Sequence, residues 1–111
     1  MTTKQIKNVA RYTAGDTGPP LQMEYLDAAG VAVDVSGWTI TLHLRRPSPA
    51  TVLTKAMTIT DGPNGLFEVT VWASGDLLEG ADQLAEVQLV DTGGVIITTQ
   101  KMHIDVDSEI A

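Results

Sequence analysis

The chain has 111 residues, of which 43% are hydrophobic, so it is long enough for one domain with a buried core and scarcely long enough for two. It contains no cysteine, which excludes a disulfide scaffold, a thiolate metal site and a cysteine nucleophile. Its formal net charge of −7 argues against a general nucleic-acid binder, because such proteins need a basic surface.

Hydropathy and the distribution of charge further limit the kind of protein this chain can be. No apolar run approaches the roughly 20 residues of a membrane helix, and the start, MTTKQIKNVARY, lacks the apolar core of a signal peptide. We therefore expect a soluble product that is not secreted and has no membrane partner. Residues 1–55 carry six basic and four acidic side chains, whereas residues 56–111 carry one and ten. This asymmetry predicts either solubilising charge or complementary faces that dock in a fixed orientation.

At the N-terminus we expect residues 1–11 to form an arm or a first strand, and residues 12–111 to form a single domain. An arm over residues 1–10 would be mobile and would become ordered on a neighbouring subunit. The stretch GDTGPP (15–20) then looks like collagen triplets, a phosphate-binding loop or a break before a strand. Collagen needs many triplets, and a phosphate loop needs a strand before it and a helix after it. We therefore predict a break, because an alternating strand follows directly.

Period-two alternation dominates the rest of the chain and predicts strands with one buried face. The predicted strands cover residues 21–25, 38–45, 51–59, 66–72, 84–90 and 95–106. Turn-forming residues separate them, in DAAG (27–30), DVSG (34–37), RPSP (46–49), DGPNG (61–65) and DTGG (91–94). About seven short strands at this spacing are typical of an antiparallel β-sandwich, with a closed barrel as the alternative.

Residues 73–80 interrupt the alternation. Ser74 precedes Asp76 there, and a side-chain oxygen followed by a negative charge suits the free N–H groups at a helix start. We expect one short helical turn, ended by Gly80. Trp72, just before it, lies on the face opposite Phe67, Val69 and Val71 in the predicted strand. It is either an exposed contact residue or a ring covered by the 73–80 turn.

The residues that carry chemistry do not form a recognisable constellation. His43 and His103 fall on predicted polar faces, without the converging ligands that a metal site needs. Ser36 and Ser48 lie in turns, outside any Gly-x-Ser-x-Gly elbow. DTGG and DGPNG match a calcium loop only in part. We therefore expect no catalytic residue, no bound metal or cofactor, and a protein that is not an enzyme.

Several stretches together resemble a known family. They are an opening Gly-Asp-x-x-Pro-Pro-Leu, a Asp-x-x-Gly-x-x-Val-Asp-Val-Ser-Gly stretch, a Thr-Ile-x-Leu-x-Leu-Arg strand, a hairpin ending in Trp, and a following Gly-Asp. The residues concerned are Gly15, Asp16, Pro19, Pro20, Leu21, Asp27, Gly30, Val33, Asp34, Val35, Ser36, Gly37, Thr39, Ile40, Leu42, Leu44, Arg45, Asp61, Gly65, Phe67, Val69, Trp72, Gly75 and Asp76. Over residues 12–106 this order resembles the N-terminal domain of phage baseplate upper proteins and related small virion proteins of tailed phages.

The resemblance implies an immunoglobulin-like β-sandwich that acts as a non-enzymatic structural protein of a virion, in the tail or baseplate. It implies other virion proteins as partners, multiple copies or a homo-oligomer in the particle, and assembly in the host cytoplasm; the net charge adds the expectation of no nucleic-acid partner. The candidate partner contacts are Trp72, Tyr12, Arg45, Arg46, Lys4 and Lys7. The alternatives are a decoration protein of the capsid or neck, and a host-surface carbohydrate-binding module that uses Trp72, Tyr12 and Tyr25.

Overall fold

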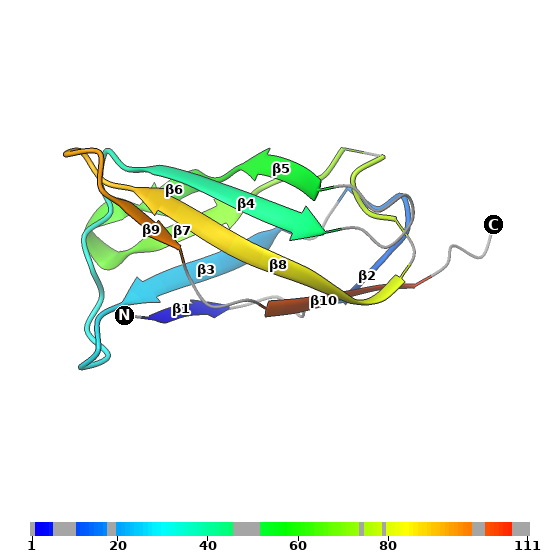
Figure 1. Cartoon of the computed structure of the whole chain (residues 1–111), viewed down its shortest axis with the longest axis horizontal. Helices are drawn as coiled ribbons and strands as arrows, with labels where there is room; N and C mark the ends of the chain where they lie inside the picture. The colour runs from blue at the N-terminus through cyan, green and yellow to red at the C-terminus, as the bar shows by residue number, and fades with distance from the viewer. Residues whose placement is uncertain are drawn as a thin grey trace.

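The structure is a computed structural model that describes residues 2–5, 11–17, 20–45, 52–73, 75–78, 80–98 and 102–107. Within these ranges the chain is almost entirely β-structure (Figure 1). The elements are β1 (Thr2–Gln5), β2 (Arg11–Thr13), β3 (Leu21–Leu26), β4 (Thr39–Arg45), β5 (Val52–Ala56), β6 (Thr58–Asp61), the 3-10 turn η1 (Gly62–Asn64), β7 (Leu66–Val69), β8 (Gly80–Val90), β9 (Ile96–Thr98) and β10 (Met102–Asp107).

The strands form two sheets that enclose one core. The smaller sheet has the order β1-β3-β7-β6, and the larger sheet has the order β2-β10-β8-β4-β5, with β9 also paired to β8 (Figure 1). In an immunoglobulin-type sandwich, strands A, B, E and D form one sheet, and strands C, F and G form the other. Here β1, β3, β7 and β6 stand in the order A-B-E-D, and β4, β8 and β10 stand in the order C-F-G. The predicted all-β sandwich is therefore confirmed.

The described residues hold more strands than the sequence predicts. Residues 95–106, expected as one strand, fall in β9 and β10, which both pair with β8, and in two other stretches the chain changes sheet. Residues 51–59, expected as one strand, divide at Met57 into β5 of the larger sheet and β6 of the smaller one. The first segment divides likewise, since β1 pairs with β3 whereas β2 pairs with β10. Thr2–Gln5 is thus a strand and not a mobile arm, and residues 6–10 lie outside the described part of the chain. The β2–β10 pair is parallel, unlike the antiparallel sheet expected.

The core follows from the alternation that the sequence shows. In β3 and β4 every second side chain is buried, as a half-buried sheet requires. Trp38, just before β4, is half-buried and packs against this core. The largest fully buried side chains are Trp72, Tyr25, Phe67, Leu21, Met23, Leu42, Leu44, Leu77, Leu89, Ile104, Val35 and Val69.

The prediction for residues 66–72 is wrong at its end. Strand β7 stops at Val69, so the period of two no longer applies beyond it. Val71 is 60% exposed, and Trp72 is fully buried. The Trp72 backbone N–H donates to the Thr17 carbonyl at 2.9 Å, which holds it against the segment between β2 and β3. Trp72 is therefore a covered ring and not an exposed one.

The helical turn lies elsewhere than predicted. Among residues 75–78 there is no helix; the Asp76 N–H donates to the Ala73 carbonyl at 3.0 Å, which closes a simple turn, and Gly80 begins β8. The 3-10 turn η1 instead forms within DGPNG, where Pro63 supplies a suitable φ. Gly65 ends it at φ +70°, a left-handed conformation that glycine adopts without strain. No helix among the described residues has the length and apolarity to cross a membrane.

The described residues of GDTGPP begin in a turn and contain no strand, as expected for a break before β3. Gly15 has φ +86°, and its N–H donates to the Leu77 carbonyl at 3.2 Å. The Asp16 carboxylate accepts the Thr13 N–H at 3.0 Å, which stabilises the end of β2. Gly18 and Pro19 lie outside the described residues. The turn thus links β2 of one sheet to β3 of the other.

Candidate docking surface

The outer face of the larger sheet carries the polar side chains of its central strands. In β4 the outward residues are half-buried or exposed, while Leu42 and Leu44 between them are fully buried. His43 was predicted on this polar face, and the structure confirms that placement. The β4–β8 register puts His43 opposite Glu86, so an imidazole and a carboxylate occupy neighbouring positions on adjacent strands. Cross-strand neighbours of this kind lie close enough to act on one ligand.

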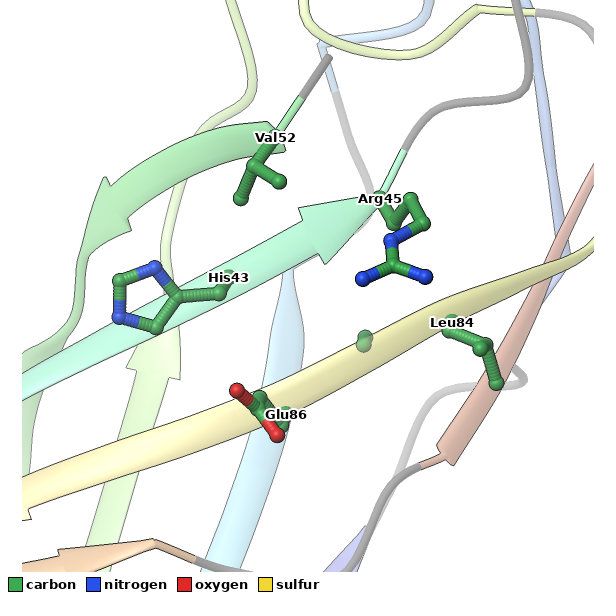
Figure 2. A pocket seen from close by; sticks show the side chains of 6 residues that line it. His43, Arg45, Val52, Leu84 and Glu86 are labelled. Carbon is green, nitrogen blue, oxygen red and sulfur yellow. The ribbon is translucent and has the colours of Figure 1, made fainter. Parts of the chain in front are cut away.

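A shallow pocket of about 140 Å³ opens on this face. Figure 2 shows the Arg45 guanidinium over the space between β4 and β8, with Glu86 and Leu84 across from it and Val52 on the neighbouring strand. Val52 lines the pocket beside Arg45 because the β4–β5 register places these two residues opposite each other. The lining residues are His43, Arg45, Val52, Leu84, Ala85 and Glu86.

The pocket combines free charge with apolar walls. Arg45 is exposed, and Glu86 is half-buried. Neither side chain forms an ion pair with any described residue. The His43 Nδ1 lies 3.4 Å from the Thr54 hydroxyl. Arg45 therefore presents five unused N–H donors beside Val52, which is 55% exposed. Such a site suits a carboxylate or a backbone carbonyl on a partner, and its lining holds no hydroxyl or thiol nucleophile.

Of the predicted partner contacts that the structure describes, Arg45 alone lies in this pocket. Lys4 belongs to β1 of the smaller sheet, where the register places it opposite Glu24. Arg46 and Lys7 lie outside the described residues. The structure therefore does not bring the predicted basic residues together into one patch, as far as it describes them.

Tyr12 and Trp72 are core residues, which corrects their expected role as surface contacts. Tyr12 is 3% exposed, and its ring meets Trp72 edge to face at a centroid distance of 5.5 Å. Burial raises the pKa of the Tyr12 hydroxyl above its ordinary value. Neither ring presents area to a partner in this fold.

Sequence reasoning missed the pocket because it depends on which strands are neighbours. The alternation of residues 84–90 places Glu86 outward, and that of residues 38–45 places His43 and Arg45 outward. Nothing in either pattern shows that β4 lies between β8 and β5. The signal available was the charge on these outward positions, and the topology supplies their juxtaposition.

Within the part of the chain that the structure describes, no group of three or more His, Asp or Glu side chains is placed to hold a metal ion. No protein-family model matches this chain, and no curated protein matches it.

Proposed function

We propose that this chain is a structural protein of a tailed-phage virion, in the tail or baseplate, that works by docking onto other virion proteins and not by catalysis. The observation that carries the proposal is the exposed, unpaired Arg45 in a shallow pocket with apolar walls. A sandwich with a filled core offers its partners flat faces and strand edges, and this pocket is a concave feature on one such face. The resemblance to baseplate upper protein domains supplies the setting.

The docking chemistry follows from the pocket. A partner's Asp or Glu carboxylate would accept two hydrogen bonds from the Arg45 guanidinium, the geometry that arginine favours. Aliphatic parts of the same segment would cover Val52 and Leu84. One such contact is weak, but many copies in a particle multiply it into a stable assembly. The specific partner would thus be an acidic segment of another virion protein.

The carbohydrate-binding alternative loses its basis in the structure. It requires an exposed aromatic platform, for which the sequence offered Trp72, Tyr12 and Tyr25. All three are buried, at 0%, 3% and 1% exposure. Defined binding to a glycan array by the isolated chain would nevertheless overturn a purely structural role. A position on the capsid or neck would change the location within the virion and keep the docking mechanism.

The first test is mass spectrometry of purified phage particles separated into capsids and tails. Stoichiometric recovery of the chain with the tails is the expected result, and recovery with the capsids would move the protein to their surface. Absence from both fractions would refute a virion role.

The second test addresses Arg45 itself. Arg45→Ala should reduce incorporation into particles by about tenfold, because the partner carboxylate loses its charged donor. Thr70→Glu is the matched control: it changes the net charge by the same amount at an exposed position after β7. Equal incorporation of wild type and Arg45→Ala would remove Arg45 from the docking surface, and an equal loss in both variants would point to net charge alone.

A further inference from the structure

Strand β5 forms one edge of the larger sheet and is paired on one side only. It hydrogen-bonds to β4 in an uninterrupted antiparallel register from Val52 to Ala56. Figure 1 shows it along the upper margin of that sheet. With five residues it is longer than β1, β2, β6 and β9, the other described strands that are paired on one side only. It is therefore the most extensive regular edge among the described strands.

The register fixes which backbone groups of β5 face outward. The Met57 N–H donates to the Ile40 carbonyl at 2.9 Å, so that pair is hydrogen-bonded. Bonded and non-bonded pairs alternate along an antiparallel ladder, which makes Lys55 and Leu53 the next bonded residues. The N–H and C=O groups of Val52, Thr54 and Ala56 consequently point away from β4, and no described residue pairs with them.

The side chains of β5 leave this edge open. Charges on an edge strand commonly prevent pairing between molecules, and β5 contains a single one, Lys55. Lys55 is turned inward, and its Nζ binds the Asp76 carboxylate at 2.6 Å, with 23% and 14% of the two side chains exposed. The exposed positions are the uncharged Val52, Thr54 and Ala56. The edge thus lacks an outward charge that would repel a second strand.

We propose that β5 pairs antiparallel with β5 of a second copy of this chain, about a two-fold axis at Thr54. In that register the outward groups of Thr54 bond to those of Thr54 in the second copy, and Val52 bonds to Ala56 on either side. On the inner side Lys55 lies opposite Leu53 of the second copy, so the two lysines are not opposed. Every free backbone group of the edge finds a partner, and no like charges meet.

Pairing would join the two larger sheets into one continuous face. The pocket at His43 and Arg45 would then occur twice on it, related by the two-fold axis. This inference deepens the proposed docking role, because it names a second copy of the chain as one partner, and its biological meaning rests on that role. The test of the pairing does not depend on the proposed role, because self-association is observable in the isolated chain.

The test uses sedimentation equilibrium and native mass spectrometry of the full chain over a range of concentrations. Wild type should form a dimer of twice the 11.8 kDa monomer mass. Thr54→Lys and Thr54→Glu should each weaken dimerisation by about tenfold or more, because each places like charges across the axis. An equimolar mixture of the two variants should recover the dimer as a heterodimer. Thr39→Lys, exposed on the same face but on β4, should dimerise as wild type does.

Three results would overturn the inference: a wild-type chain that stays monomeric throughout, Thr54 variants that dimerise as wild type does, or a mixture that fails to recover the dimer. Circular dichroism of each variant verifies that the fold is kept. A dimer that is absent from phage particles would refute the proposed virion role and leave the β5 pairing intact. A chain that stays monomeric in solution but is present in particles would refute the β5 pairing and leave the proposed virion role intact.

Discussion

Among the residues that the structure describes, three buried side-chain atoms have no hydrogen-bond partner: the Tyr12 hydroxyl, the Trp72 Nε1 and the Gln83 Oε1. The other end of the Gln83 amide is well placed, since its Nε2 donates to the carbonyls of Leu78 and Gly80. A buried polar atom without a partner costs about 1–3 kcal/mol. These three atoms therefore destabilise the folded state, and apolar burial elsewhere in the core offsets their cost.

Tyr12→Phe removes one of these atoms and keeps the ring. We expect the free energy of unfolding to stay constant or to rise by about 1 kcal/mol, because no hydrogen bond is lost with the hydroxyl. Urea unfolding followed by tryptophan fluorescence measures the change. A loss of stability of more than about 1 kcal/mol would show that the hydroxyl is hydrogen-bonded in solution.

The two buried tyrosines also make stability fall in alkali. Burial raises the pKa of Tyr12 and of Tyr25 above the ordinary value of 10.0. Their contribution is complete below pH 10 and is lost as the pH rises through the folded-state pKa, because the unfolded chain releases these protons first. We expect a decline of at most about 1.4 kcal/mol per pH unit for each tyrosine.

Urea titrations at about pH 9 and about pH 11 test this, with the Tyr12→Phe/Tyr25→Phe double variant as the control. The double variant should lose less stability over the interval. An identical loss in both proteins would assign the alkaline sensitivity to other groups.

At the scale of elements, two turns repeat the same local design. Asp27 and Asp91 each end a strand, and in both turns the carboxylate accepts the N–H groups two and four residues ahead, at 2.8–3.0 Å. Gly30 and Gly94 take the left-handed position, at φ +81° and +86°. Their sequences, DAAG and DTGG, predict this outcome because Asp accepts local backbone bonds and Gly allows positive φ.

Two glycines with similar φ should respond very differently to a methyl group. A Cβ on Gly65 would lie 2.8 Å from the backbone carbonyl oxygens of Tyr25 and Val33, whereas one on Gly30 would meet nothing within 4 Å. Gly30→Ala should cost about 1–2 kcal/mol from backbone conformation alone. Gly65→Ala should cost at least about 3 kcal/mol, since two backbone segments must also move.

Thermal or urea unfolding of the two variants, measured side by side, tests the difference. Equal losses would mean that the contact between η1 and the segment after β3 can relax freely.

The strands and turns could be predicted from the sequence, but their partners could not. Alternation identified β3, β4 and β8, and it gave the inward face of β4 correctly. It failed at Trp72, where the ladder ends while the hydrophobic pattern continues. It also failed at Met57, because a strand that crosses between sheets keeps the same local pattern. The pocket was missed for a related reason, since Arg45, Val52 and Leu84 meet only through strand order.

At the scale of the whole molecule, the net negative charge destabilises the compact folded state through repulsion between like charges. The chain carries a net charge of −7, and the Lys55–Asp76 pair is partly buried. Self-repulsion among exposed carboxylates is screened by salt, whereas a partly buried pair is screened less. We expect the melting temperature to rise as sodium chloride increases from about 0.01 M to about 0.15 M.

Calorimetry across this range, repeated with potassium chloride to separate screening from ion-specific effects, measures the trend. A falling melting temperature would show that attractive surface pairs outweigh the repulsion.

The parallel β2–β10 pair joins nearly opposite ends of the chain, with Arg11 beside Asp105 and Thr13 beside Asp107. A load applied through the flanking chain would pull β2 backward from its start and β10 forward from its end, along the same line. Parallel strands loaded in this way slide past each other, so their hydrogen bonds carry the tension together and do not open one after another. We therefore expect the β2–β10 pairing to resist stretching of the sandwich.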